Sequence, residues 1–224
     1  MSNRLIEFAG QTMELHHSGA LFWHQQNMLV VGDLHLEKAS SYHKSGQILP
    51  PYDTAETLHR LAMAIKFFTP ARIMLLGDIF HDGEAWLRMR VPDRHQLLKL
   101  FEGIDTIWVK GNHDEHFVPP GHVSQESCVL DGINFRHMMD TTEQAPEISA
   151  HYHPVASIRH RGTRVRRACF VCAPQRLIMP AFGALAGGLD VGDVVLTPLR
   201  GPDTQIYLLG NNAVFAAPAG LIVS

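Results

Sequence analysis

Three apolar segments in the first half of the chain each end in a glycine followed by a polar side chain. They cover residues 27–33, 71–78 and 106–115. Their unbroken apolar character predicts strands that are buried on both faces, as in a parallel sheet. Leucines and isoleucines at helical spacing predict a helix over 54–68, and a second helical pattern covers 93–101. This alternation of strands and helices indicates parallel crossover units.

The second half of the chain has the pattern of short strands joined by turns. Residues 128–137 predict a hairpin that turns at Asp131 and Gly132. Residues 147–154 contain another strand end, and 155–172 predict a second hairpin that turns near Gly162. Residues 193–199 and 205–217 are expected to add strands, the latter with a turn at Asn211 and Asn212. The whole pattern predicts an α/β fold of two facing mixed sheets flanked by helices.

Length and composition favour one globular domain over residues 1–224. The formal net charge of -3 argues against a general polyanion binder, so any affinity for nucleic acid has to come from a local patch. We expect a cytoplasmic protein, because the chain shows no signal-peptide pattern and no apolar stretch long enough to span a membrane. Cys169 and Cys172 lie in an apolar segment, which favours a buried strand over a zinc or redox site.

Polar side chains that can bind metals follow several of the predicted strands. In open α/β sheets such positions converge beyond the carboxyl ends of the strands. The set contains carboxylates, an amide and several imidazoles, which are the groups that a two-metal phosphoesterase needs. The residues are Asp33, His35, Asp78, Asn112, His113, Asp114, His137, His151 and His153.

The local spacing gives an expectation about geometry. Asp33 and His35 are two positions apart, so a strand would point both to the same side, and the same holds for His151 and His153. The glycines that precede the polar positions are expected to let the backbone turn sharply toward the metals. These glycines are Gly32, Gly77 and Gly111.

The ordered motifs resemble a known superfamily. "GDLH", "GDIFHD", "GNHDE", a later isolated histidine and "HYH" resemble, in order, the blocks of the calcineurin-like metallophosphoesterases, over positions 32–153. The segments "DLHLEKAS", "ILPPY", "HYHP" and "MPAFGALAGG" resemble the narrower DNA ligase-associated metallophosphoesterase (PdeM) family. The resemblance implies a four-layer α/β/β/α metallophosphoesterase sandwich. It also implies a manganese-dependent DNA phosphodiesterase with single-stranded DNA endonuclease activity, associated with a DNA repair system that contains a DNA ligase and a helicase.

The resemblance also implies a role for each site residue. Asp33, His35 and His153 are expected to bind one divalent metal ion, preferably Mn²⁺, and Asp78 to bridge it to a second ion. Asn112, His137 and His151 are expected to bind that second ion, and His122 is a poorer substitute for His137. His113 is expected to be the general acid, oriented by Asp114, while a water activated between the metals attacks the phosphate. Ala150 departs from the family pattern, which has glycine before the last His-x-His.

Several residues are weaker candidates for contact with the substrate. His81 follows the bridging carboxylate by three positions, and an arginine-rich segment lies in the second predicted hairpin. Like charges on paired strands destabilise a hairpin unless a polyanion neutralises them, so Arg161, Arg164 and Arg166 are candidate DNA contacts. Lys38 is expected to be a solvated residue, and "MPAFGALAGG" to provide tight backbone packing. The alternative function is hydrolysis of nucleotides or other small phosphoesters, and a catalytically inactive scaffold is a further alternative.

Overall fold

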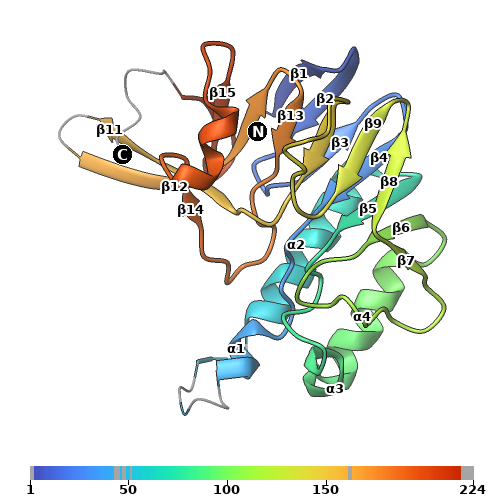
Figure 1. Cartoon of the computed structure of the whole chain (residues 1–224). Coiled ribbons are helices and arrows are strands. Elements are labelled where there is room, and N and C mark those ends of the chain that lie inside the picture. The colour runs from blue at the N-terminus through green and yellow to red at the C-terminus, as the bar shows by residue number, and fades with distance from the viewer. Residues whose placement is uncertain (1–2, 43–45, 47–48, 51, 161–162, 218–224) are drawn as a thin grey trace.

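The computed structural model describes residues 3–42, 46, 49–50, 52–160 and 163–217. Two mixed β-sheets pack face to face (Figure 1). The first sheet has the order β1-β2-β3-β4-β5-β6-β7. Its strands are β1 (Arg4–Phe8), β2 (Gln11–Leu15), β3 (Leu21–Trp23), β4 (Met28–Val31), β5 (Arg72–Leu76), β6 (Asp105–Val109) and β7 (Ser124–Gln125).

The middle of this sheet is parallel, as the strand and helix alternation predicts. β4 pairs with β5, and β5 pairs with β6, in parallel register. The crossovers contain α2 (Asp53–Phe68) and α4 (Val91–Phe101), with the short helices α1 (Lys38–Ser41) and α3 (Ala85–Arg88) beside them. The antiparallel strands β1 to β3 were not predicted, because β1 is largely exposed and β3 has only three residues.

The second sheet is assembled mainly from the second half of the chain. Its main path has the order β14-β11-β12-β13-β10-β9-β8, and β15 joins it through β12 and pairs with β16. Its strands are β8 (Ser127–Leu130), β9 (Ile133–Arg136), β10 (Glu147–Ser149), β11 (Pro154–His160), β12 (Thr163–Ala173), β13 (Arg176–Ile178), β14 (Leu189–Asp190), β15 (Gln205–Leu209) and β16 (Val214–Ala216).

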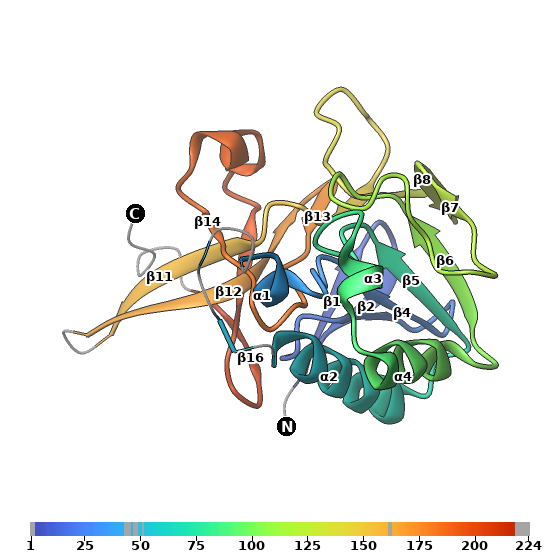
Figure 2. The same cartoon turned by 90° about the horizontal axis from the view of Figure 1, so that it is seen from below.

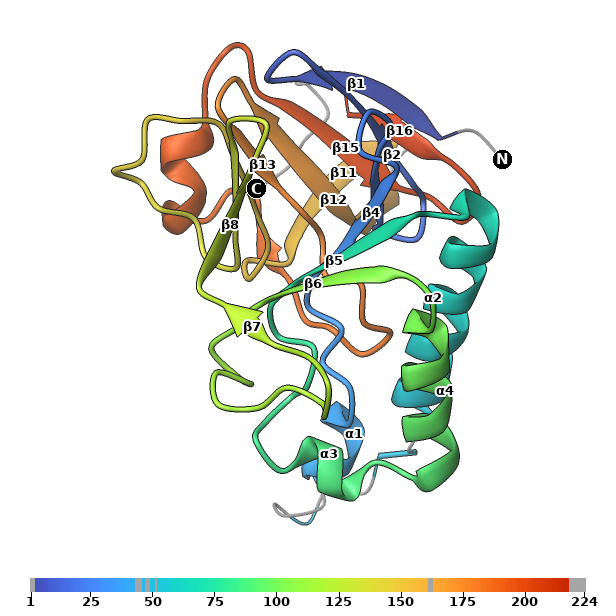
Figure 3. The ribbon, with the colours of Figure 1, turned by 90° about the vertical axis from the view of Figure 1, so that its right-hand side faces the viewer.

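Alternating side chains of the same strand enter two different cores. Met28 and Val30 of β4 lie in the core between the sheets. Leu29 and Val31 lie in a second core, against α2 and α4. Because successive strand residues point to opposite faces, a strand between two cores has to be apolar throughout. This confirms burial on both faces, and Figure 3 shows α2 and α4 together on the outer face of the first sheet.

The outer face of the second sheet is covered by a helical turn where the sequence predicted a strand. The segment 193–199 is not a strand: Val194–Leu199 forms the 3-10 helix η2. The Asp193 side chain accepts a hydrogen bond from the Val195 N–H and starts this helix, and Pro198 has no N–H to donate to a strand partner. Leu196 and Leu199 then pack on the outer core of the sheet. The predicted α/β sandwich is confirmed, and η2 provides helical cover on this face.

The predicted hairpins of the second half are present. β8 and β9 pair antiparallel, and both Asp131 and Gly132 at their turn have positive φ. β15 and β16 also pair antiparallel. β11 and β12 form a long antiparallel pair that projects from the body (Figure 2), while its predicted turn near Gly162 lies outside the described residues.

Cys169 and Cys172 both belong to β12, as expected. Their separation of three positions places them on opposite faces of the strand. Burial raises the pKa of each thiol, which favours the protonated, inert form. A separate finding is that, in the described part of the chain, no helix is both long and apolar enough to cross a membrane.

Candidate metal centre

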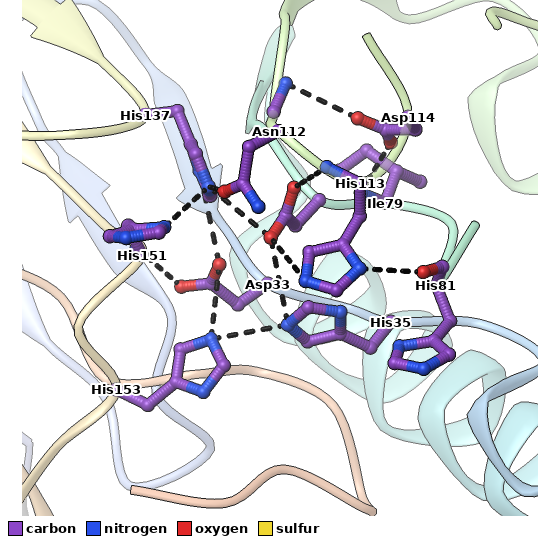
Figure 4. Close-up of polar contacts among 12 residues, drawn as sticks. Asp33, His35, Ile79, His81, Asn112, His113, Asp114, His137, His151 and His153 are labelled. Carbon is purple, nitrogen blue, oxygen red and sulfur yellow. Dashed lines mark hydrogen bonds and ion pairs between the residues drawn. The ribbon is translucent and has the colours of Figure 1, made fainter. Parts of the chain in front are cut away.

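The polar residues predicted from sequence converge at one edge of the two sheets (Figure 4). They follow the carboxyl ends of β4, β5 and β6 in the first sheet, and of β9 and β10 in the second. Segments more than 100 positions apart therefore share one site: the His151 N–H donates a 2.9 Å hydrogen bond to Asp33 Oδ2. The site is built jointly by both sheets.

The backbone at this edge is not extended, in contrast to the expectation of alternating strand residues. Five of the candidate ligands have a left-handed backbone with φ between 45° and 68°: Asp33, His35, Asp78, His151 and His153. This conformation is uncommon for residues other than glycine and persists where surrounding contacts enforce it. The Asp33 N–H bonds to the Gly77 carbonyl, and the His35 N–H bonds to the Asp78 carbonyl. Neighbouring loops therefore hold each other in this strained form.

Ala150 tolerates its departure from the family pattern for a related reason. The positive φ falls on His151, with 68°, and Ala150 has no positive φ. The Ala150 methyl group is fully buried beside Gly32, where a Cβ at position 32 would lie only 2.8 Å away. Alanine at position 150 is compatible with the site because Gly32, which packs against it, has no side chain.

The glycines of the site mainly allow neighbouring loops to approach closely. The expectation that all three provide sharp backbone turns was wrong. Gly77 has a positive φ of 78°, but Gly32 and Gly111 do not. A Cβ on Gly111 would lie 2.1 Å from both the backbone nitrogen and Oδ1 of Asp78, and one on Gly77 would lie 2.4 Å from His137 Nδ1. The loops approach so closely that a methyl group would displace a ligand.

The first group of possible ligands is Asp33, His35 and His153, as predicted. His153 Nε2 lies 3.2 Å from Asp33 Oδ1 and 3.2 Å from His35 Nε2. Asp33 Oδ1 is buried and has no hydrogen-bond partner. A buried carboxylate oxygen without a donor is costly unless a cation compensates it.

The second group is Asp78, His137 and His151. His137 Nε2 lies 3.3 Å from Asp78 Oδ2, 3.2 Å from His151 Nδ1 and 3.0 Å from Asn112 Oδ1. Asn112 therefore belongs to this group, as predicted. His122 lies elsewhere, because its ring accepts a hydrogen bond from Trp108 Nε1.

These distances fit two cations. Ligand atoms that surround one ion at about 2.1 Å lie roughly 3.0–3.5 Å from each other. His153 Nε2 lies at this distance from its two partners in the first group, and His137 Nε2 from Asp78 and His151 in the second. Asp78 Oδ2 faces both groups, since it also lies 3.8 Å from His35 Nε2. The donors are carboxylate and amide oxygens with imidazole nitrogens, a mixture that suits Mn²⁺, Fe²⁺, Co²⁺ or Zn²⁺. The residues present can hold two divalent ions with Asp78 between them.

The electrostatics of the site favour positive charge. Burial lowers the pKa of His35 to about 2, so this imidazole is neutral. Burial alone would lower the pKa of His137, but the hydrogen bond to Asp78 and the charges of Asp33 and Asp78 raise it to about 9. A cation that binds His137 has to displace that proton, and the two carboxylates stabilise the cation in its place.

Comparison with known proteins agrees with this geometry. The family model of calcineurin-like phosphoesterases matches residues 27–160, a segment that contains every ligand described above. The chain belongs to the calcineurin-like phosphoesterase family. Its members are metal-dependent phosphoesterases, and this phosphoesterase retains the ordered motifs of the superfamily. The comparison with curated proteins found no match.

Two solved structures are similar to this phosphoesterase. Pseudomonas putida nuclease MPE is 26% identical with a TM-score of 0.74, and the alignment covers 96% of this chain and 100% of that one. A predicted phosphoesterase from Streptococcus pneumoniae TIGR4 is 14% identical with a TM-score of 0.31, over 88% of this chain and 91% of that one.

His113 lies beside the two ligand groups. Its Nδ1 is 2.7 Å from the His81 carbonyl oxygen, and its Nε2 is 3.9 Å from Asp78 Oδ2 (Figure 4). The carbonyl accepts the Nδ1 proton and so directs Nε2 into the site. The His81 ring stacks on the His113 ring with a centroid distance of 5.1 Å. His81 thus contacts the candidate acid through both its backbone and its ring.

Asp114 does not orient the His113 imidazole directly, contrary to the expectation. Its Oδ2 accepts hydrogen bonds from the N–H groups of Ile79 and Phe80, and its Oδ1 accepts one from Gly111 N–H. The carboxylate is occupied by backbone donors because it is buried between two loops. Its role is to join the loop of His113 to the loop of Asp78.

The other candidates are more dispersed. Lys38 is half-buried rather than solvated. Burial lowers its pKa, while the negative charges of Asp33 and Asp78 act in the opposite direction.

The arginine candidates lie at different distances from the site. Arg166 lies near the site, and its Nη2 donates to the Gly188 carbonyl. Arg164 lies farther along the hairpin opposite Arg159, and Arg161 is outside the described residues. Sequence gave no signal for Arg60, an α2 residue that borders a cavity beside His153.

The tight packing around Gly111 gives a first prediction. Gly111→Ala should reduce the bound metal and lower phosphodiesterase activity by about 100-fold, because the new methyl group displaces the Asp78 backbone and carboxylate. Metal analysis and hydrolysis of bis-p-nitrophenyl phosphate measure both effects. Gly83→Ala is the control, since a Cβ there meets no atom within 4 Å. Full activity of Gly111→Ala would contradict the close approach.

The position of Asp78 between the groups gives a second prediction. Asp78→Ala should abolish activity and lower the metal content, since Asp78 Oδ2 lies near the Nε2 atoms of both His35 and His137, one from each group. Asp105→Ala, an exposed change at the start of β6, is the control and should retain the metal. Near-normal turnover of Asp78→Ala would exclude the bridging role.

Proposed function

We propose that this phosphoesterase is a DNA phosphodiesterase, with endonuclease activity on single-stranded DNA and Mn²⁺ as its preferred ion. The observation that carries the proposal is the full-length similarity to Pseudomonas putida nuclease MPE, at 26% identity and a TM-score of 0.74. The "MPAFGALAGG" segment, beyond the family match, adds the resemblance to DNA ligase-associated phosphoesterases. On the same resemblance we propose a role in a repair system with a DNA ligase and a helicase, and we further propose a cytoplasmic location.

The geometry supports hydrolysis of a phosphodiester. Two divalent ions, when bound, polarise the phosphate and lower the pKa of a water molecule enough for it to act as the nucleophile at neutral pH. The protein has to supply a proton to the departing sugar oxygen. His113 is placed for this step, because Nδ1 is fixed by the His81 carbonyl and Nε2 faces Asp78.

One experiment tests the substrate and the metal together. Labelled linear and circular DNA, single- and double-stranded, is incubated with the protein across a panel of divalent ions. We expect cleavage of the circular single strand, which requires an endonuclease, with Mn²⁺ as the best ion and no cleavage in a chelator. Hydrolysis of nucleotides or aryl phosphates without cleavage of any DNA would replace the proposal with a phosphatase or small-molecule phosphodiesterase.

His113 gives a third prediction. His113→Ala should retain both metals and slow DNA cleavage by about 10²- to 10⁴-fold, as expected for loss of a general acid. The loss should be much smaller for bis-p-nitrophenyl phosphate, because nitrophenolate leaves without a proton. Metal analysis distinguishes an acid from a ligand. Equal losses on the two substrates would indicate that His113 only positions the phosphate.

A further inference from the structure

Two cavities border the metal centre, one beside each ligand group. A cavity of about 420 Å³ includes Asn112 and His137 of the second group in its lining. A cavity of about 280 Å³ includes His153 of the first group. A DNA strand that places one phosphate on the metals can extend along either cavity, so their charges bear on its path.

The cavity beside Asn112 contains cations that are already neutralised. Lys110 Nζ lies 2.6 Å from Glu126 Oε1, and both residues line the cavity. Arg136 lies 2.9 Å from Asp140 Oδ2 and 3.3 Å from Glu147 Oε2. These pairs leave little net positive charge for a phosphate.

The cavity beside His153 has the opposite character. Arg60, Arg166 and Arg167 line it, and none of its described lining residues is acidic; we call it the arginine pocket. Within the described chain, none of these arginines forms an ion pair with a carboxylate. A concave surface lined by one sign of charge concentrates the electrostatic field and attracts the opposite charge. The pocket is therefore suited to an anion.

Hydrogen bonds fix the pocket relative to the metal ligands. The Gly183 N–H donates to the Asp33 carbonyl at 3.0 Å, and the Leu189 N–H donates to the His153 carbonyl at 3.2 Å. A Cβ on Gly183 would lie 2.3 Å from the Leu34 carbonyl oxygen, so this loop packs directly behind the site. The pocket wall and the ligands of the first group therefore form one connected structure.

The arginines of the pocket each bond one backbone carbonyl and keep further donors. The Arg60 guanidinium lies over the Phe182 ring and uses Nη2 to bond the Ser18 carbonyl. Arg167 is exposed and uses Nη1 to bond the Arg166 carbonyl. A guanidinium has five N–H donors, so each retains others for a phosphate. Arg166 also donates one hydrogen bond, to the Gly188 carbonyl in the pocket wall, so a change at Arg166 would alter the wall as well as the charge.

We propose that the arginine pocket binds the backbone phosphate that flanks the scissile one, with Arg60 and Arg167 as its contacts. The strand extends from the metals past His153 into this pocket. This inference rests on the proposed DNA phosphodiesterase function and assigns it a second phosphate site. The site explains how a protein with a net charge of -3 binds a polyanion locally. It also places binding at the base of the β11–β12 hairpin rather than at Arg164.

The test compares binding of a labelled single-stranded oligonucleotide by fluorescence anisotropy, in a chelator that arrests cleavage and over a range of salt concentrations. Each lost phosphate contact should reduce the slope of log affinity against log salt by about 0.7. Arg60→Gln with Arg167→Gln removes the contacts to this one phosphate, so it should lower the slope by about 0.7 and weaken binding roughly 5-fold at about 0.1 M salt. In the metal-loaded protein, KM for the oligonucleotide should rise, with kcat for bis-p-nitrophenyl phosphate unchanged.

Three further variants separate charge from folding. Lys66→Gln removes an exposed cation from the same helix, outside the arginine pocket, and should retain the slope. Arg60→Lys keeps a cation and a donor for Ser18, so it should retain the slope as well. Arg167→Gln alone changes an exposed side chain and should lower the slope by roughly half of the double variant's reduction, without changing the melting temperature.

The outcomes distinguish this inference from the proposed function. Suppose that the wild-type protein cleaves single-stranded DNA and the double variant keeps the wild-type salt slope and KM. The proposed phosphate site in the arginine pocket is then wrong, while the proposed DNA phosphodiesterase function is retained. Equal losses in Arg60→Lys and Arg60→Gln, with a normal slope in Arg167→Gln, would show a structural role and also overturn the pocket. If the wild type hydrolyses aryl diesters but neither binds nor cleaves DNA, both proposals fail.

Discussion

The rest of the structure depends on holding two buried carboxylates, Asp33 and Asp78, close to each other. Such a pair is unfavourable unless each charge is matched by hydrogen-bond donors and cations. Backbone donors from other loops meet part of this need: His151 N–H bonds Asp33 Oδ2, and His113 N–H bonds Asp78 Oδ1. The remaining oxygens face the imidazoles and define the places where cations bind.

This constraint accounts for the unusual backbone of the site. A carboxylate bonded to the backbone of a neighbouring loop requires close approach, which explains why a Cβ at Gly111 would collide with Asp78. It also explains the left-handed residues, because the loops must turn sharply at these positions. A residue such as Asp78 thereby points its side chain into the site while its carbonyl accepts a hydrogen bond from the neighbouring loop. The cost of these conformations is offset by the two large cores that anchor the strands on either side of β4 and β5.

The same arrangement separates reaction chemistry from substrate choice. The two ligand groups and His113 can serve many phosphoesters, since they contact only the reacting phosphate. Discrimination has to come from surfaces around them, and those surfaces differ in charge. One neighbouring cavity has its cations paired with glutamate and aspartate, whereas the arginine pocket has no such partners among its described lining residues. On the proposed function, this difference in charge would distinguish long anionic substrates from small ones outside the metal centre.

The sequence by itself determined which polar residues converge at the candidate site. Apolar strands followed by Gly-Asp, Gly-Asn and His-x-His are local patterns, and the carboxyl ends of parallel strands must meet at one edge of a sheet. The parallel β4–β5–β6 core and the hairpin at Asp131 and Gly132 were predictable for the same local reason. The segment 193–199 was not, because a short apolar run with a proline fits a strand or a 3-10 turn equally well.

Only the tertiary structure decided the partners of these residues. Asp114 bonds backbone N–H groups instead of the His113 ring, and the His81 carbonyl takes that place, because the two loops come together through contacts over 30 positions apart. Arg60 reaches the site region from a helix, where its spacing resembles that of any solvated arginine. Hydrogen bonds and charge depend on distances between segments, and a linear pattern records the residue types but not those distances.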